Sequence, residues 1–400
     1  MAHIAPRDDR RTGVREPGRR GLPSRTGTDY CRCMRRASLV AVLGLFLLSV
    51  PGSARAASPA ITVDNVDTLH RVDTYDLGAD PLYTVYGMDA RSLYPMLFFT
   101  PQDRARVERL DLRTGRVRWA IDLRCAQGPP VVGPRVVLYA DHQCSAYDRP
   151  RITAAHPSSG HTLWTASAEG ALVTRSVVVL YTLHELETGG FVSTIWGVRA
   201  GTGERLWTYR NPNPDHGFVV PTFATSQAVY VWDHYDVVAL DPRTGSLLWR
   251  LEAPGRGQGI WAADELGVYV YRAPGDREWL QALDGRTGDL RWQVADPTGL
   301  SVQDGTAYLN TLFELQARSP ESGELRWANS EGSVFDAFNG VAWTVGYDGD
   351  PFLVALDAST GERVAVYPSS FREIYRTIPT EERVLIETDD GRLRVYEPDR

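Results

Sequence analysis

The segment ALDPRTGSLLW, residues 239–249, decides the fold because its pattern returns along the chain, with Gly in seventh and Trp in eleventh position. The glycines follow one another at intervals of 45, 43, 42, 43, 35 and 38 residues, and the last copy ends in Ala365 instead of Trp. Such a period is typical of architectures that grow by adding one structural unit at a time. The other copies are RLDLRTGRVRW (109–119), AAHPSSGHTLW (154–164), GVRAGTGERLW (197–207), ALDGRTGDLRW (282–292), ARSPESGELRW (317–327) and ALDASTGERVA (355–365).

The residues around this segment predict four strands per repeat. VYVWD (229–233) and VVALD (237–241) are rich in β-branched and aromatic residues and are joined by a polar turn, which is typical of a hairpin. Gly245 supplies the positive φ of the next turn, SLLWRLE (246–252) returns as a strand, and FVVPTFA (218–224) precedes the hairpin. Four antiparallel strands in about 42 residues make the blade of a β-propeller. The alternative, a β-sandwich, would not return one Gly and one Trp at a near-constant interval.

The two ends of the chain predict the number of blades. After the seventh copy, FREIYRTI (371–378), RVLIET and RLRVYEP (392–398) supply three strands and the fourth is missing. TLHRVDTYDL (68–77) is strand-like and precedes the first full repeat. We therefore predict an all-β, eight-bladed propeller of four-stranded antiparallel blades, whose last blade is closed by the N-terminal strand. Residues 57–400 would form this single domain.

The N-terminal region has the order of a secretory signal peptide. Arg35 and Arg36 precede an apolar run over residues 37–50, and the small-residue tripeptide 54–56 follows. We predict a signal peptide over residues 34–56, cleavage near Ala56 and a secreted or extracytoplasmic protein in the cell envelope. The alternative is a retained anchor, although the apolar run of 14 residues is shorter than the about 20 that a membrane-spanning helix needs.

The residues that precede this signal are polar, rich in Arg and without pattern. We expect residues 1–33 to be disordered and interpret Met34 as the start of the translated chain. The alternative is an unusually long n-region of the signal peptide.

The cysteines fit an exported protein. Cys31 and Cys33 precede the cleavage site, so the mature chain keeps Cys125 and Cys144. Because disulfides persist outside the cytoplasm, we predict a Cys125–Cys144 bridge, which would contribute about 3 kcal/mol in the chain-entropy model. Two buried free thiols are the alternative.

Composition and charge exclude several classes of partner. An apolar fraction of 43% and a charged fraction of 23% are those of a folded soluble protein. The first 56 residues hold 11 Arg and four acidic residues, so the remainder carries 32 Arg against 46 acidic residues, a net charge of −14. Such a charge repels phosphate backbones and anionic lipids, so we expect neither nucleic acid nor a membrane surface as partner.

The pattern Ala-x-Asp-x-x-Thr-Gly-x-x-x-Trp resembles the tryptophan-docking motif of the pyrroloquinoline quinone (PQQ) repeat family, over nearly the whole mature chain. The resemblance implies an eight-bladed propeller in which each Trp stacks on a Gly-containing turn and docks to the neighbouring blade. Docking is expected to be weaker where the pattern decays, at Ala365 and in the turns 156–160 and 319–323. The residues with this structural role are Trp119, Trp164, Trp207, Trp249, Trp292, Trp327, Gly115, Gly160, Gly203, Gly245, Gly288, Gly323 and Gly361.

The chain lacks the features that accompany catalysis in similar quinoproteins. Those enzymes hold PQQ beside a Ca²⁺ ion, often under a disulfide between adjacent cysteines, and no Cys-Cys pair occurs here. No Asp-x-Asp-x-Asp-Gly loop, nucleophile elbow, Walker loop or His-Glu-x-x-His motif is present either. The seven histidines of the mature chain are dispersed, without the spacing of metal ligands. We therefore predict no catalytic residues, no metal site and no cofactor, and keep a PQQ-dependent and calcium-dependent oxidoreductase with a reduced site as the alternative.

Any binding surface should lie on the face opposite the Thr-Gly turns, where two segments, residues 183–192 and 211–217, are longer than the others. Extended loops on a rigid scaffold are where recognition residues concentrate. The sequence thus favours a monomeric, non-catalytic exported propeller that binds a protein or a cell-envelope component, with ordinary polar loops as the alternative interpretation of these segments. The candidate binding residues are His184, Glu185, Asn211, Asp215, His216 and Arg256.

Overall fold

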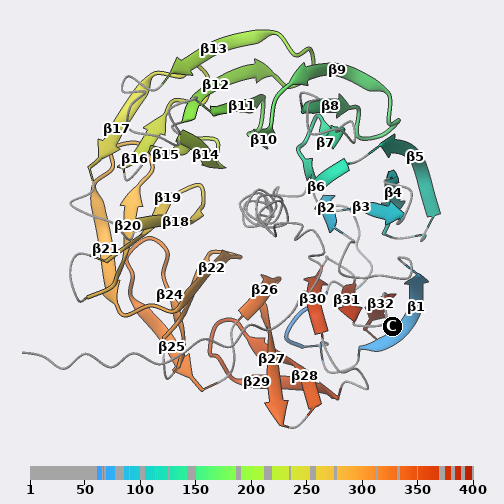
Figure 1. Ribbon diagram of the computed structural model, residues 1–400. Helices are drawn as coiled ribbons and strands as arrows, with labels where there is room; N and C mark the ends of the chain where they lie inside the picture. The colour runs from blue at the N-terminus through green and yellow to red at the C-terminus, as the bar shows by residue number, and fades with distance from the viewer. Residues whose placement is uncertain are drawn as a thin grey trace, which may run out of the picture. The chain divides into compact units, whose positions relative to one another are not determined.

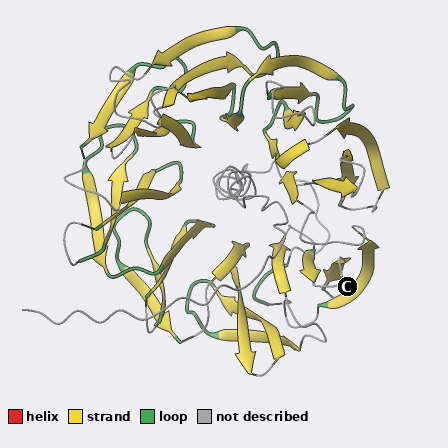
Figure 2. Ribbon diagram, viewed as in Figure 1, coloured by secondary structure: helices red, strands yellow, loops and turns green. Residues whose placement is uncertain are grey.

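The computed structural model describes only part of the compact unit Gly44–Arg400, and the segments 1–33 and 34–56 lie outside the described residues. No α-helix occurs among the residues it describes (Figure 2). The described residues are 61–64, 66, 69–76, 85–89, 91–99, 104–112, 114, 116–124, 126–141, 150–185, 191–210, 219–233, 236–252, 258–273, 277–311, 314–330, 334–348, 350–368, 374–379, 383–388 and 392–398.

The strands form eight four-stranded antiparallel sheets, which confirms the predicted blades. We number the blades along the chain. Blades one to four are β2 (Val85–Asp89), β3 (Ser92–Phe99), β4 (Arg104–Asp111) and β5 (Arg116–Arg124); β6 (Ala126–Val132), β7 (Val137–Asp141), β8 (Arg151–Ala155) and β9 (Thr162–Ser167); β10 (Gly170–Val173), β11 (Val177–Glu185), β12 (Phe191–Arg199) and β13 (Arg205–Arg210); and β14 (Val219–Ala224), β15 (Val229–Asp233), β16 (Asp236–Leu240) and β17 (Leu247–Leu251).

The second half of the chain repeats this arrangement, and its last sheet also takes in the first strand. Blades five to eight are β18 (Gln258–Ala263), β19 (Gly267–Arg272), β20 (Trp279–Asp284) and β21 (Leu290–Ala295); β22 (Gly299–Gln303), β23 (Thr306–Asn310), β24 (Leu315–Arg318) and β25 (Leu325–Asn329); β26 (Val334–Phe338), β27 (Val341–Asp348), β28 (Asp350–Asp357) and β29 (Arg363–Pro368); and β30 (Ile374–Pro379), β31 (Val384–Thr388) and β32 (Arg392–Glu397) with β1 (His70–Asp76).

Blade four shows why the strands have these sequences. In Figure 1 the first strand of each blade lies toward the centre of the ring of sheets and the fourth lies at its outside. The middle strands β15 and β16 are covered on both faces by neighbouring blades, so nearly every residue is apolar and buried. On the outermost strand β17, Trp249 is buried whereas Leu247 is exposed.

The eighth blade combines the two ends of the described chain. Strand β1 pairs antiparallel with β32, from His70 opposite Glu397 to Asp76 opposite Arg392, so that it is the outermost strand of this blade (Figure 1). The predicted pairing of 68–77 with 392–398 is therefore present between the described residues of these segments. That β1 holds the ring closed stays a prediction, which a deletion can test.

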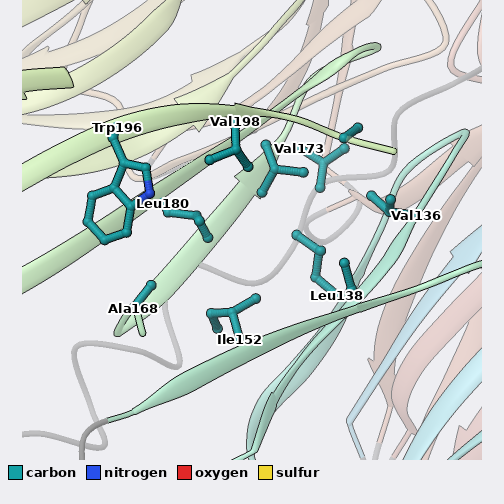
Figure 3. Close-up of a cluster of buried hydrophobic side chains, with 11 residues drawn as sticks. Val136, Leu138, Ile152, Ala168, Val173, Leu180, Trp196 and Val198 are labelled. Carbon is teal, nitrogen blue, oxygen red and sulfur yellow. The ribbon is translucent and has the colours of Figure 1, made fainter. Parts of the chain in front are cut away.

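Eight clusters of buried apolar side chains join the sheets, one at each interface between consecutive blades. Figure 3 shows the cluster between blades two and three, in which Leu138 and Ile152 face Leu180 and Trp196. The eighth cluster joins Leu385 of blade eight to Leu93 of blade one. The sheets thus pack into a closed series, and the core of the protein is divided among the interfaces.

The repeated motif forms the turn between the third and fourth strands of a blade. In blade four the Asp241 carboxylate accepts hydrogen bonds from the backbone N–H groups of Arg243 and Thr244 at 2.9 and 2.8 Å. Gly245 has φ 68°, a conformation that glycine adopts without strain. Burial raises the pKa of Asp241, but these hydrogen bonds outweigh it and lower the pKa below its usual value.

Candidate functional site

The six motif tryptophans each contact the motif turn of the following blade. The indole of Trp207 donates a hydrogen bond to the carbonyl oxygen of Pro242 at 3.0 Å. A Cβ atom added to Gly245 would lie 2.6 Å from Cδ2 of the same ring, so only glycine lets the indole approach this closely. The same pair of contacts joins Trp119 to Pro157 and Gly160, Trp164 to Ala200 and Gly203, Trp249 to Gly285 and Gly288, Trp292 to Pro320 and Gly323, and Trp327 to Ala358 and Gly361.

The two variant turns, 156–160 and 319–323, keep both contacts. Their sequences differ from the motif, yet a backbone carbonyl and a glycine at the same positions are sufficient to receive the indole. Gly115 lies outside the described residues. The tryptophans and glycines therefore join the blades, and a binding site must be sought among other residues.

An aromatic residue on the second strand of several blades accompanies the motif, and sequence reasoning missed it. Tyr230 lies opposite Ala239 in the sheet, and its ring centroid is 6.1 Å from that of Trp249. The small Ala side chain leaves room for the tyrosine beneath the indole. Equivalent pairs join Tyr94 to Trp119, Tyr269 to Trp292 and Tyr308 to Trp327. Tyr94, Tyr230 and Tyr269 precede the motif residues Asp111, Asp241 and Asp284 by 17, 11 and 15 residues, so no constant spacing marks them in the sequence.

The alternating direction of the strands defines two ends of the ring of sheets. The motif turns and the connections from first to second strands share one end, which we call the motif end. The turns from second to third strands and the connections between blades share the other, which we call the loop end.

The predicted binding residues belong to segments at the loop end. His184 is exposed near the end of β11, and Glu185 is the last residue of that strand. Asn211, Asp215, His216 and Arg256 lie outside the described residues, in the segments that connect β13 to β14 and β17 to β18. Of the six candidates, only His184 and Glu185, which are neighbours in the chain, lie among the described residues.

An ion-pair network at the loop end holds the second-to-third strand turn of blade four. Arg250 contacts the Asp233 carboxylate at 2.6 Å and the Asp236 carboxylate at 2.8 Å. Asp233 ends β15 and Asp236 begins β16, so one guanidinium on β17 joins both sides of the turn. Asp233 is buried, and burial together with the charge of Asp233 raises the pKa of the neighbouring Tyr209 hydroxyl. These ion pairs join the two strands on either side of the turn at the loop end.

Blade five carries an aromatic group beside that turn. The rings of Trp261 on β18 and Tyr271 on β19 stack with centroids 4.8 Å apart and planes 6° from parallel. A Cβ atom on Gly259 would lie 3.2 Å from Trp232 of blade four and 3.9 Å from Trp261, so the two indoles lie close to the same glycine. Burial and a hydrogen bond to Glu278 raise the pKa of Tyr271 to about 12, which keeps its hydroxyl protonated as a donor. All three aromatic rings are half-buried and offer surface to a ligand.

The opposite face of the same blade presents polar side chains. Arg272 donates to the Gln281 side-chain oxygen at 3.2 Å, and Gln281 donates to Gln293 at 3.1 Å. These residues occupy three neighbouring strands, so the hydrogen bonds run across the blade. Aromatic and polar side chains therefore occur on the two faces of one blade near its loop end. We call Trp232, Trp261, Tyr271, Arg272 and Glu278 the loop-end site.

The tryptophans outside the repeated motif point to this site in the sequence. Once the six motif tryptophans are set aside, five remain: Trp196 and Trp343 are buried, while Trp232, Trp261 and Trp279 are half-buried and all lie on blades four and five. Loop length instead favoured residues 183–192 and 211–217, which lie within blade three and between blades three and four.

The described residues do not fit the ligand set of a calcium-dependent quinone site. Within the described ranges no three His, Cys, Asp or Glu side chains come together as metal ligands. The Trp261 ring is stacked against Tyr271, whose hydroxyl is hydrogen-bonded to Glu278. No helix in the described part of the chain has the length and apolar character needed to cross a membrane.

Comparison with solved structures shows the same fold in proteins of different activities. BamB from Moraxella catarrhalis superimposes with a TM-score of 0.51 at 16% identity over 82% of this chain and 99% of that one. Quinohemoprotein alcohol dehydrogenase from Comamonas testosteroni gives 0.54 at 14% identity over 84% and 77% of the two chains. Sqt1 from Saccharomyces cerevisiae gives 0.53 at 13% identity over 82% and 99%. At these identities the likeness concerns the fold alone.

Sequence comparison gives the family. No curated protein matches the chain. A family of proteins described as outer membrane protein assembly factor BamB matches residues 103–231 and 193–337, which together span more than half of the chain. The tryptophan contacts described above lie largely within these residues, and the resemblance to the PQQ-repeat propellers is confirmed. The chain thus belongs to the PQQ-repeat β-propeller family described as outer membrane protein assembly factor BamB.

Proposed function

We propose that the protein is an exported, non-catalytic β-propeller that binds a protein partner through the loop end of blades four and five. The observation that carries this proposal is the gathering of half-buried aromatic residues outside the tryptophan contacts, in Trp232, Trp261 and Tyr271. Every other recurrent aromatic residue named above is used to join blades.

The chemistry of the loop-end site favours a protein over a polymer of the envelope. Tryptophan, tyrosine and arginine are the residues that contribute most binding energy at protein interfaces, especially where rigid neighbours exclude water. Arg250 fixes the adjacent turn through Asp233 and Asp236, so that little conformational freedom is lost when a partner binds. The description of the family as an assembly factor agrees with a protein partner.

The sequence before residue 57 supports a place for this function outside the cytoplasm. The signal-peptide pattern over 34–56 predicts cleavage near Ala56 and release of residues 57–400 into the cell envelope. Mass spectrometry of the N-terminal peptide from envelope and cytoplasmic fractions tests this. A mature N-terminus at residue 57 in the envelope fraction is expected, and an intact residue 34 in that fraction would indicate a retained anchor instead.

The binding proposal can be tested with purified residues 57–400 carrying an affinity tag. Proteins captured from an envelope extract by the wild type are compared with those captured by Trp261→Ala with Tyr271→Ala, and by Glu278→Arg. Glu278 is exposed and hydrogen-bonded to Tyr271, so its charge reversal changes the surface of the site without truncating a buried side chain. The matched control is Arg286→Ala, an exposed residue of the motif end.

We expect both loop-end variants to reduce capture of the specific partner about tenfold or more, as loss of an interface anchor does, while the control captures as the wild type. Equal capture by all variants, or a loss confined to Arg286→Ala, would refute the proposed surface. Far-UV circular dichroism of each variant establishes that the blades remain folded.

The alternative, a quinone-dependent oxidoreductase, is favoured only by the shared fold of the alcohol dehydrogenase from Comamonas testosteroni. Purified protein is mixed with PQQ, Ca²⁺, an artificial electron acceptor and a panel of alcohols and sugars. We expect no reduction of the acceptor above the protein-free rate. Sustained reduction that depends on both PQQ and substrate would replace the binding proposal by the enzymatic one.

A further inference from the structure

Two of the eight interfaces between blades lack the motif tryptophan. Ala317 lies opposite Trp327 in blade six, whereas the corresponding residue of blade seven, Ala355, lies opposite Ala365. In blade eight the corresponding pair is Val395 and Asp73 on β1. The indole is therefore missing both where blade seven meets blade eight and where blade eight meets blade one.

At the interface of blades seven and eight, a short N-terminal segment fills the space. We call residues 61–64 and 66 the strap. Ile61 is 3% exposed and Val66 is fully buried, and both belong to the same apolar cluster as Ala365 and Trp343 of blade seven and Ile386 of blade eight. No other described interface takes in residues from outside the blades.

Hydrogen bonds hold the strap in this position. The Tyr367 hydroxyl on β29 donates to the backbone carbonyl of Val66. The Val66 backbone N–H donates to the carbonyl of Thr62 at 3.0 Å, which closes the strap into a turn. Trp343 stands where other blades have tyrosine and lies 6.3 Å from the Tyr367 ring. Trp343 and two aliphatic side chains of the strap therefore pack in the same cluster as Ala365.

At the interface of blades eight and one, an arginine makes the hydrogen bond that tryptophan makes elsewhere. Leu112 occupies the position of Pro242 in the motif turn, whose carbonyl accepts the indole N–H of Trp207. The Leu112 carbonyl instead accepts a hydrogen bond from the Arg383 guanidinium. A second nitrogen of Arg383 pairs with the Glu397 carboxylate on β32, and the Arg383 side chain is only 15% exposed. The guanidinium therefore links blade eight to the turn of blade one.

We propose that the strap and Arg383 form a two-part latch that holds the eighth blade in the ring in place of the two missing tryptophans. Because the strap belongs to the N-terminal segment, displacing that segment uncovers the cluster between blades seven and eight. The eighth blade is then the place where the ring opens first.

The strap is tested in residues 57–400 by pairing its removal with restoration of the tryptophan. Ile61→Ala with Val66→Ala should speed amide hydrogen exchange in β30 to β32 about tenfold or more, because buried aliphatic truncation of this kind weakens an interface strongly. Asp64→Ala, at an exposed position of the strap, should leave exchange unchanged. Ala365→Trp should raise exchange in the intact chain by overfilling the cluster.

In the chain with the truncated strap, Ala365→Trp should have the opposite effect and slow exchange in β30 to β32. This change of sign is the result that a general loss of stability does not produce. If Ala365→Trp acts in the same direction with and without the strap, the strap does not occupy the place of the indole and the proposal fails.

Arg383 is tested by Arg383→Met, which keeps the aliphatic stem and removes the donors, with Arg392→Met on the exposed start of β32 as control. Arg383→Met should speed exchange in blades eight and one, and its effect should be additional to that of the strap variants because it acts at another interface. Exchange that rises only in distant blades, or equally with Arg392→Met, would refute the role of Arg383.

Discussion

Replacing Trp207 by alanine perturbs one interface between blades at its centre. The indole is 7% exposed, packs in the cluster between blades three and four, and donates to the Pro242 carbonyl at 3.0 Å. Truncation removes a large buried ring and leaves that carbonyl without its donor. Phe and Trp truncations in cores cost about 3–5 kcal/mol, which is a large share of the 5–15 kcal/mol by which proteins of this kind are stable.

The companion substitution is Gly245→Ala, whose cost has two separable parts. The backbone at φ 68° disfavours any side chain by about 1–2 kcal/mol. A new Cβ would also lie 2.6 Å from Cδ2 and Cε3 of Trp207, and overfilling of this kind costs about 1–3 kcal/mol. The second part exists only while the indole is present. The double variant should therefore lose about 1–3 kcal/mol less stability than the sum of the losses in the two single variants.

The free energy of unfolding is measured with guanidinium chloride and followed by far-UV circular dichroism, because the substitution removes a fluorophore. Leu247→Ala, at a side chain 56% exposed on β17, is the control and should change stability by less than about 0.5 kcal/mol. A cost below about 1 kcal/mol for Trp207→Ala, or strict additivity with Gly245→Ala, would refute the account of how the blades are joined.

Three further predictions concern the turns and the ends of the chain. Burial raises the pKa of Asp111, but hydrogen bonds from Arg118 and Thr114 lower it to about 2. A carboxylate whose pKa is lowered on folding stabilises the folded state at any pH above its unfolded pKa. Asp111→Asn should therefore reduce the free energy of unfolding above about pH 4, and its difference from wild type should vanish as the pH falls to about 2. Cys125 and Cys144 lie outside the described residues, and the predicted disulfide requires that the denatured mature protein show no titratable thiol until a reductant is added. Deleting residues 57–77 removes both β1 and the strap, and should lower the thermal midpoint far more than trimming a terminal tail, which calorimetry would reveal; an unchanged midpoint would contradict the role of β1.

The blades were predictable because the contact between a motif tryptophan and a glycine of the next blade recurs once per blade. Each indole needs a glycine of the next turn, so Gly245 and Trp249 recur at the interval of one blade and can be recognised without any structure. The pairing of β1 with β32 followed from counting strands at both ends. The tyrosine beneath the indole escaped notice because its partner Ala239 is small and common, and only the register shows the space between them.

The latch could not be predicted because it lies where the repeated motif lacks its tryptophan, and no sequence pattern marks the residues that take its place. Ala365 marked a decayed repeat, but nothing in the sequence of residues 61–66 indicates which gap it fills. Arg383 is one of many arginines, and its role depends on the Leu112 carbonyl of a blade far away in the sequence. The loop-end site escaped for a similar reason, because Trp261 and Tyr271 stack across two strands with no fixed spacing.

Site-specific photo-cross-linking tests the central claim, that the loop end of blade five binds a protein, most directly. A photoreactive amino acid replaces exposed Glu278 at the loop end or exposed Arg286 at the motif end, and the tagged protein is irradiated in its own envelope. The account predicts that position 278 yields a discrete adduct with one protein, lost in the Trp261→Ala, Tyr271→Ala background, and that position 286 yields none. Adducts at position 286 alone, or the same adducts at both positions, would contradict it.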